Sequence, residues 1–138
     1  MTSVIGQSRA KTPGNSVPIT RCNSAGFQIL LGLALLTASI AMLSPGSEEQ
    51  PLPFWQADKL VHLLTFMLLG FFADAGWPER GFTPVKYLPL LCYGIGIEWL
   101  QQYVPFREFS LLDFVANAAG LALYGLALLP LLRHQGIR

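Results

Sequence analysis

Four apolar segments, separated by short polar or proline-rich stretches, occupy most of this chain. They run over residues 27–43, 58–77, 86–104 and 111–132. Each is close to the length that a helix needs to cross the hydrocarbon core of a bilayer. Only 12% of the residues are charged, whereas a soluble domain carries about 25%. We therefore predict an all-α fold: a membrane domain over residues 27–138 built as a bundle of four transmembrane helices, preceded by a flexible cytoplasmic tail over residues 1–26.

The charge balance argues against a nucleic-acid partner. Nine Lys and Arg against eight Asp and Glu leave a net charge of +1, so there is no basic surface to hold a phosphate backbone. The two cysteines, Cys22 and Cys92, lie in the tail and in an apolar segment, which is not the spacing of a disulfide-rich secreted domain. We expect both to be free thiols. Membrane lipid is the expected surrounding, and the sequence predicts no particular oligomeric state.

The first apolar segment has two interpretations. It contains no charged residue between positions 27 and 43 and is followed by Ser44, Pro45 and Gly46, which is typical of a short membrane helix. The small residues around Ala41 also resemble the cleavage site of a signal peptide, although the segment is long for such a signal and its basic leader is extended. The membrane helix is our prediction.

The basic residues predict how the helices are oriented. On one side lie Arg9, Lys11, Arg21, Arg80, Lys86, Arg133 and Arg138. Only Lys59 and Arg107 lie on the other side. By the positive-inside rule both termini are cytoplasmic, and the loops at 44–57 and 105–110 face outward. Asp74 and Glu79, near the cytoplasmic side, are expected to be solvated or interfacial.

Polar side chains recur at three- and four-residue intervals near the predicted outward ends of the last three segments, which puts them on one face of each helix. They are Asp58, Lys59 and His62 on the second segment, Glu98, Gln101 and Gln102 on the third, and Asp113 and Asn117 on the fourth. At the helical rise per residue, His62, Glu98 and Asn117 lie roughly 6 to 9 Å below the outer boundary. The short turn at 105–110 makes the last two helices antiparallel neighbours. We therefore predict an outward-facing polar pocket.

Small residues on the fourth segment predict close helix packing. Ala116 and Gly120 are four residues apart, as are Ala118 and Ala122, and such faces let membrane helices approach one another closely.

Several of the polar groups also have a structural interpretation. Asp58 and Lys59 can serve as a helix cap and an interfacial anchor. Ser110 precedes Asp113 by three residues, which is a capping pattern. Glu98 is harder to explain in this way, because a carboxylate at the centre of a membrane helix costs roughly 2.5 to 3.5 kcal/mol. For Glu98 a functional interpretation is favoured.

The order and spacing of these residues resemble the VanZ-like family of small bacterial membrane proteins. The matching pattern, within residues 53–132, is Asp58-Lys59-x-x-His62, Glu98-x-x-Gln101 and Pro105-x-Arg107-x-x-Ser110-x-x-Asp113-x-x-x-Asn117-x-x-Gly120. The resemblance implies a multi-pass protein of the bacterial inner membrane with a role in the cell envelope, in a family named for a protein that raises resistance to the glycopeptide teicoplanin. The matching positions are our candidate ligand-binding residues: Asp58, Lys59, His62, Glu98, Gln101, Arg107, Ser110, Asp113 and Asn117. The family offers no established catalytic assignment for them.

Two mechanisms remain open from the sequence. In the first, the pocket binds a cell-wall or lipid-linked ligand, with Arg107 and Lys59 as contacts for an anionic group. In the second, the protein is an intramembrane enzyme acting on a lipid-linked or peptide substrate, with Glu98 and His62 as acid and base. Transport has little support, because the four segments show no inverted repeat.

The sequence predicts neither a cofactor nor a metal ion. Gly94-x-Gly96 lies inside an apolar segment and lacks the further glycine and the strand of a phosphate-binding loop. His62, Glu98 and Asp113 form a mixed nitrogen and oxygen set of the kind that holds divalent ions. However, they lie on three different helices and match no compact metal motif. The same three residues are the candidates for a catalytic role, and enzyme status is left open.

Overall fold

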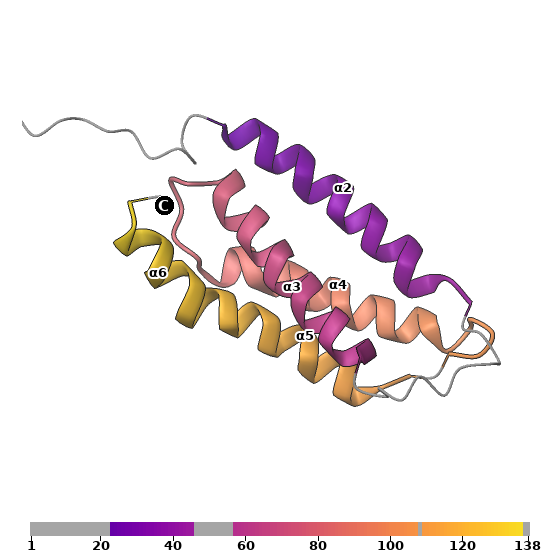
Figure 1. Ribbon diagram of the computed structural model, residues 1–138. Helices are drawn as coiled ribbons and strands as arrows, with labels where there is room; N and C mark the ends of the chain where they lie inside the picture. The colour runs from indigo at the N-terminus through magenta and orange to yellow at the C-terminus, as the bar shows by residue number, and fades with distance from the viewer. Residues whose placement is uncertain (1–22, 46–56, 108, 137–138) are drawn as a thin grey trace, which may run out of the picture.

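Helices make up the regular structure of the part of the chain that the computed structural model describes, residues 23–45, 57–107 and 109–136; it contains no strand. In order, the elements are α2 (Ser24–Leu43), α3 (Ala57–Gly76), α4 (Pro84–Gln101), α5 (Leu111–Leu123), the π-helical η1 (Tyr124–Leu128) and α6 (Leu129–His134). The last three are continuous and form one rod (Figure 1). The all-α prediction is confirmed, and the rods end within three residues of the predicted segments. Of the predicted tail, residues 1–22 lie outside the described residues, and α2 already begins at Ser24.

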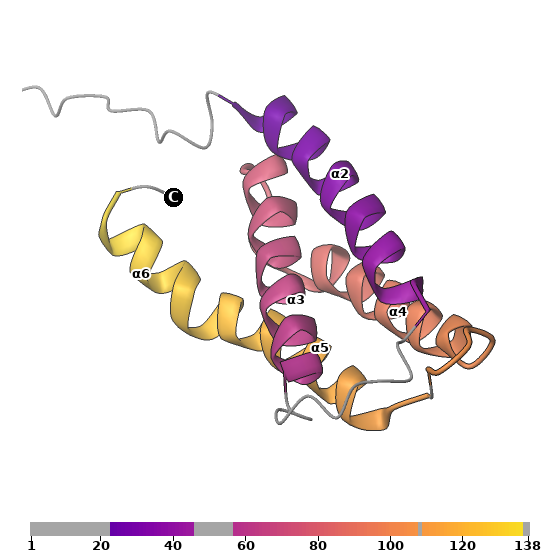
Figure 2. The same ribbon diagram turned by 45° about the vertical axis from the view of Figure 1, so that its right-hand side comes forward.

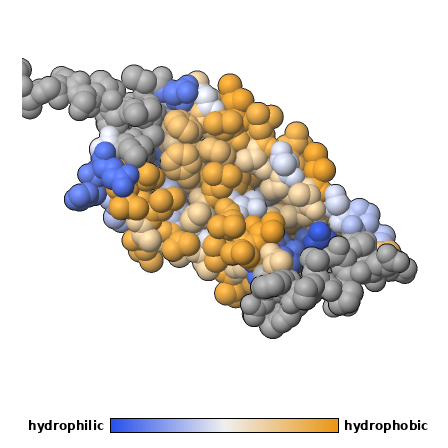
Figure 3. Space-filling view, viewed as in Figure 1, coloured by the Kyte–Doolittle hydropathy of each residue, from blue (hydrophilic) through white to orange (hydrophobic). Residues whose placement is uncertain are grey.

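Three rods are long and apolar enough to cross a membrane: α2, α3 and the rod over Leu111–His134. Large apolar side chains cover the outside of the molecule, and Figure 3 shows them as a broad band with hydrophilic residues toward the two ends. Monomeric proteins that are surrounded by water rarely expose a continuous apolar surface of this extent, so the surface is compatible with a membrane environment. The fourth rod, α4, is less apolar because it carries Lys86, Glu98 and Gln101, all of which are buried against the other helices.

Successive rods run in opposite directions, so helix ends gather at two ends of the bundle (Figures 1 and 2). The end at which α2 and α4 finish and α3 and α5 begin is called the site end below. The opposite end holds the beginnings of α2 and α4, the end of α3, and α6. Helix α3 contacts α2, α4, α5 and η1 and is the central helix of the bundle.

The seam between α3 and α5 is close because small residues line it. A Cβ atom at Gly120 would collide with the backbone carbonyl oxygen of Leu63. Ala116, one turn earlier, is also buried. Ala118 and Ala122 do not lie in this seam; they line a hollow shared with α4. One of the two predicted small-residue faces therefore packs against a helix, as the spacing indicates.

Helix α2 lies at the edge of the bundle, with only 11% of its most apolar stretch buried. A side-chain amide bonds at each of its ends, and the Tyr93 hydroxyl of α4 bonds to Leu35 and Ser39 between them. At the opposite end, Gln28 Nε2 donates a hydrogen bond to the carbonyl oxygen of Gly76 at 2.8 Å. At the site end, Gln101 Nε2 donates to the carbonyl oxygen of Met42 at 2.9 Å. Both ends of α2 are thus tied to neighbouring helices.

A buried ion pair lies at the opposite end of the bundle. Lys86 Nζ is 2.7 Å from Asp74 Oδ1 and also donates to the carbonyl oxygens of Trp77, at 2.9 Å, and Arg80. The Tyr124 hydroxyl donates to Asp74 Oδ2 at 2.9 Å. Asp74 is fully buried, so the expectation that it is solvated or interfacial is wrong. The short turn after α3 brings Lys86, in the first turn of α4, back onto the carboxylate. We call this group the Asp74–Lys86–Tyr124 cluster.

Candidate functional site

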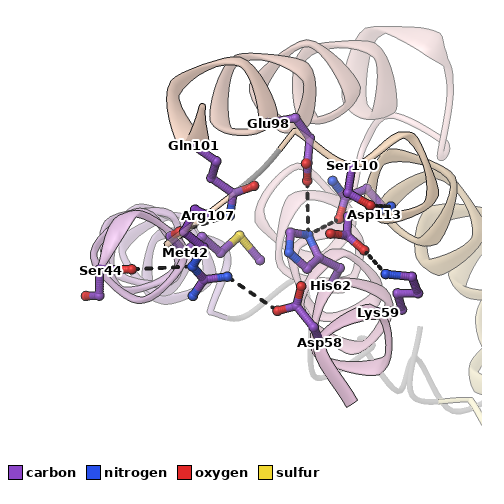
Figure 4. A network of polar contacts seen from close by, with 11 residues as sticks. Met42, Ser44, Asp58, Lys59, His62, Glu98, Gln101, Arg107, Ser110 and Asp113 are labelled. Atoms are coloured by element: carbon purple, nitrogen blue, oxygen red, sulfur yellow. Dashed lines mark hydrogen bonds and ion pairs between the residues drawn. The ribbon is translucent and has the colours of Figure 1, made fainter. Parts of the chain in front are cut away.

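Buried polar side chains from three helices meet at the site end, and Figure 4 shows two of them, His62 and Glu98. His62 comes from α3, Glu98 from α4 and Asn117 from α5. His62 Nδ1 is 3.0 Å from Asn117 Oδ1 and 3.4 Å from Glu98 Oε1. The relative exposures of these residues are 1%, 0% and 0%. The polar stripes on the three helices therefore converge, and we call these residues the polar core.

A glycine on α4 makes room for this arrangement. A Cβ atom at Gly94 would lie 3.1 Å from Asn117 Nδ2 and 3.0 Å from the Phe66 ring. Any larger residue would push the amide away from His62. Gly96, by contrast, has open space around its Cα. The Gly94-x-Gly96 pair thus includes one residue, Gly94, whose lack of a side chain makes room for the polar core.

Two ion pairs lie around the polar core and form its rim. Lys59 Nζ is 2.9 Å from Asp113 Oδ1. Arg107 Nη1 is 3.5 Å from Asp58 Oδ1, and Arg107 Nε donates to the Ser44 carbonyl oxygen at 3.4 Å. Asp113 is buried, whereas the side chains of Asp58 and Arg107 remain 47% and 25% exposed. Both cations that the sequence analysis assigned to an anionic ligand are thus paired with aspartates.

The charges of the core and rim do not balance. Asp58, Glu98 and Asp113 are three carboxyl groups, whereas Lys59 and Arg107 are two cations. When all five groups are ionised, one negative charge is in excess. Uncompensated charge is costly inside a protein. A proton on the buried Glu98 carboxylate or on the imidazole, or a bound cation, would remove the excess.

Four buried side-chain atoms of the polar core have no hydrogen-bond partner among the described residues. They are His62 Nε2, Glu98 Oε1, Glu98 Oε2 and Asn117 Nδ2. Leaving such an atom unpaired costs about 1–3 kcal/mol, and native structures keep few of them. Their concentration in one place distinguishes this region from the rest of the described chain. They include both acceptors and a donor, so a bound group with both kinds of partner would satisfy them.

Two of the predicted site residues make structural contacts instead of joining the core. Gln101 turns toward α2 and bonds to Met42. The Ser110 hydroxyl caps α5 by accepting a hydrogen bond from the Asp113 backbone N–H at 3.3 Å, as the capping pattern predicts. Among the described residues, these contacts explain both side chains without a ligand.

The turn between α4 and α5 holds a strained residue beside the rim. Phe106 has a φ of 59°, in the left-handed region. This conformation costs a residue with a Cβ roughly 1–2 kcal/mol. Strain of this kind concentrates at functional sites. Phe106 directly precedes Arg107, which contributes the guanidinium group of the rim.

Two hollows of about 380 Å³ each lie away from the polar core. One lies between α4 and the last rod and includes Phe82 and Leu91 in its lining. The other lies between α2, α3 and α4 and includes Leu35 and Trp77. Both linings are mainly apolar. At the site end, the described residues form an enclosed polar core with an exposed rim.

The residues that could hold a metal ion differ from the set considered in the sequence analysis. One ring nitrogen of His62 and one carboxylate oxygen from each of Asp58 and Asp113 lie within 4.8 Å of one another. The set of possible metal ligands thus contains Asp58, where the sequence suggested Glu98. The signal for this set is the four-residue spacing of Asp58 and His62 on α3.

No protein-family model matches the chain, and no similar protein is found among curated proteins or solved structures.

Proposed function

We propose that this chain is a VanZ-like integral membrane protein of the bacterial inner membrane, with four spans, both termini cytoplasmic and the site end facing outward. The three apolar rods support membrane insertion, and the inward-facing polar residues of α4 explain its lower hydropathy. Arg80 and Arg133 lie toward the opposite end, in agreement with a cytoplasmic location for that end. Seven residues of the pattern that resembles the family form the core and rim of the site, whereas Gln101 and Ser110 make structural contacts.

The function that the geometry supports best is binding of a cell-wall or lipid-linked ligand through its polar head group. The observation on which this proposal rests is the set of four unpaired atoms in the polar core. Hydroxyl or amide groups of a sugar or peptide would donate to the Glu98 oxygens and accept from Asn117 Nδ2. A purely apolar ligand would leave all four atoms unpaired.

Arg107 is the rim residue best suited to an anionic part of the same ligand. Its contacts with Asp58 and Ser44 are long, 3.5 and 3.4 Å, and both side chains of the ion pair are partly exposed. Such a pair contributes less than about 1 kcal/mol. A phosphate or carboxylate that bound both arms of the guanidinium group would form a stronger, bidentate contact. Arg107 can therefore exchange Asp58 for an anionic ligand at a small cost in free energy.

The proposal is tested by mass spectrometry of the lipids and cell-wall fragments that copurify with the full chain. We expect a head-group-bearing lipid or fragment with the wild type that is reduced at least tenfold in Glu98→Gln and in Arg107→Ala. Arg133→Ala, which removes a cation from the opposite end, is the matched control and should retain the ligand. Circular dichroism establishes that each variant is folded. Equal ligand content in all four proteins would contradict the proposal.

The family resemblance adds a cellular expectation. If the ligand is a glycopeptide target or its precursor, expression of the chain lowers susceptibility to teicoplanin, and Glu98→Gln abolishes the effect. The measurement is the minimal inhibitory concentration in a susceptible host, with expression level matched by immunoblot.

A second candidate function is acid–base catalysis on a lipid-linked or peptide substrate. The specific observation in its favour is the buried approach of His62 Nδ1 to Glu98 Oε1, at 3.4 Å, which suits the sharing of a proton. Turnover of a candidate lipid by the purified chain should then be lost in both Glu98→Gln and His62→Ala. Turnover that persists in both variants would rule out this assignment.

A further inference from the structure

We propose that the site end holds a divalent transition-metal ion, ligated by Asp58, His62 and Asp113. Asp58 and His62 lie in the first two turns of α3 and Asp113 in the first turn of α5, and these two helices begin side by side at the site end (Figure 4). One potential ligand atom from each lies within 4.8 Å of the other two. The site does not depend on the head group proposed above, and either proposal can fail without the other.

The spacing of the ligand atoms suits a small cation. Zinc binds imidazole nitrogen and carboxylate oxygen at about 2.0–2.2 Å, so its ligands lie roughly 3.3–3.6 Å apart. The separations between the three atoms must therefore shorten by up to about 1.5 Å. Asp58 can provide most of this movement, because its side chain is 47% exposed and its contact with Arg107 is long. Asp113 and His62 are buried and already fixed by their neighbours.

The hydrogen bonding of His62 is an independent observation that points to a metal. Its Nδ1 faces the Asn117 side-chain oxygen, which can only accept, so Nδ1 bears the hydrogen. In the neutral ring, Nε2 then presents a lone pair, and this atom is buried without a hydrogen-bond partner among the described residues. Histidine ligands of metals regularly have this arrangement, with one nitrogen oriented by an amide or carboxylate and the other on the metal.

Glu98 completes the arrangement as a positioning residue. Figure 4 shows its carboxylate directed at the His62 ring from α4. Neither of its oxygens has a hydrogen-bond partner among the described residues, although the side chain is fully buried. A carboxylate behind a histidine ligand fixes the ring and raises its basicity. This role explains why a costly buried anion lies beside an imidazole.

The charges of the site also favour a cation. When Glu98 is ionised, the three carboxyl groups exceed the two rim cations by one charge. Among the described residues, Asp58 and Asp113 use only their Oδ1 atoms in contacts with Arg107 and Lys59. Their Oδ2 atoms are available to a metal. A divalent ion would change the net charge of the core and rim from one excess negative charge to one excess positive charge, next to Arg107 and Lys59.

The ligand set selects the class of metal. One imidazole with two carboxylates suits zinc and similar transition metals better than calcium or magnesium, which prefer oxygen ligands only. Three protein ligands leave at least one coordination position open in a zinc site. An oxygen of an anionic group is the natural occupant of that position.

The test uses the full chain, purified in detergent with a tag that contains no histidine. Zinc chloride is titrated by calorimetry, and the metal retained after gel filtration is measured by mass spectrometry. We expect one zinc per chain in the wild type. Asp58→Asn and His62→Ala should weaken binding at least tenfold, and Glu98→Gln, which acts through His62, about ten- to hundredfold. His134→Ala, which removes the histidine of α6, is the matched control and should bind as the wild type does.

Each outcome decides the proposal. Zinc binding that is equal in the wild type, Asp58→Asn and His62→Ala identifies adventitious zinc and overturns it, as does absence of binding to the wild type. If His62→Ala fails to fold, the exposed Asp58→Asn variant still decides between the two results. Cobalt in place of zinc provides a spectroscopic readout, because visible absorption bands lost in Asp58→Asn report direct ligation. If the wild type binds no zinc but still copurifies with the lipid, the metal proposal fails and the proposed function stands.

Discussion

The two ends of the bundle each hold a buried polar cluster, and the clusters differ in how well their atoms are paired. In the Asp74–Lys86–Tyr124 cluster, both carboxylate oxygens accept hydrogen bonds and the ammonium group has several acceptors. In the polar core at the site end, four buried atoms have no partner among the described residues. Burial is similar in the two places, so exposure alone would not distinguish them.

The difference separates a structural role from a binding role. A buried network in which every member is paired holds a helix bundle in one arrangement. A buried network with unpaired members is costly, and it persists where something else supplies the partners. The four predictions below test whether stability resides at the opposite end and binding at the site end.

The largest effect is expected for Lys86→Met. It leaves the Asp74 carboxylate buried without its cation, and breaking a buried pair in this way lowers the free energy of unfolding by about 3–5 kcal/mol. The measurement is unfolding by a denaturing detergent, followed by circular dichroism. The double variant Asp74→Leu, Lys86→Met should recover much of the loss, because it removes both charges. A loss under about 1 kcal/mol in the single variant would show that the pair has no structural role.

A smaller loss is expected for Tyr124→Phe. The substitution keeps the ring and removes the hydrogen bond from the hydroxyl to Asp74, and a bond to a charged group contributes about 1.5–3 kcal/mol. The same unfolding experiment measures it. Tyr103→Phe is the control, since Tyr103 is 68% exposed, and its stability should not change. Equal stability of both variants would contradict the assignment of Tyr124 to the structural cluster.

Glu98→Gln should change stability by no more than about 1 kcal/mol, because no hydrogen bond of the carboxylate is lost. Asp74→Asn makes the same chemical change at the opposite end and should destabilise markedly more. Ligand copurification should show the reverse order. If Glu98→Gln is as destabilising as Asp74→Asn, the comparison between the two ends fails.

The smallest change in stability is expected for Arg107→Ala. Its ion pair is long and partly exposed, so the loss should be under about 1 kcal/mol and should shrink further at high salt. Arg107→Lys keeps the charge but removes the planar fork, and it should retain stability while binding less of an anionic ligand. A large loss of stability in Arg107→Ala would place the rim among the structural elements.

The helices and the convergence of the polar core could be predicted from the sequence. Apolar runs mark the rods, and the four-residue spacing of Asp58 with His62, and of Asp113 with Asn117, defines the face on which each pair lies. Depth, counted from the helix ends, then brings His62, Glu98 and Asn117 to one level. These inferences need only helix geometry and one short turn.

The direction of Gln101 could not be predicted in the same way. Three residues along a helix leave a rotation of about 60° between Glu98 and Gln101. That is enough for Glu98 to face His62 on α3 and for Gln101 to face Met42 on α2. Which neighbour occupies each direction depends on where the first helix packs, and its apolar surface gives no indication of that.

The Asp74–Lys86–Tyr124 cluster was missed for a different reason. A lysine near a helix end is ordinarily interpreted as a determinant of orientation and a nearby aspartate as solvated. The signal that would have found the pair is the position of Asp74 within the apolar run of α3, with Lys86 in the first turn of the next helix. Tyr124 lies far along the chain, and only the packed structure shows it.

The two side-chain amide hydrogen bonds at the ends of α2 have a consequence for how this helix is positioned in the bundle. Gln28 of α2 donates a hydrogen bond to a backbone oxygen at the end of α3, and Gln101 of α4 donates one to a backbone oxygen at the end of α2. Between these two bonds, the Tyr93 hydroxyl of α4 lies 2.9 Å from the Ser39 hydroxyl and donates to the Leu35 carbonyl oxygen at 3.1 Å. Polar contacts at three levels therefore fix the axial position of α2 against α3 and α4, which contacts between apolar side chains alone do not specify.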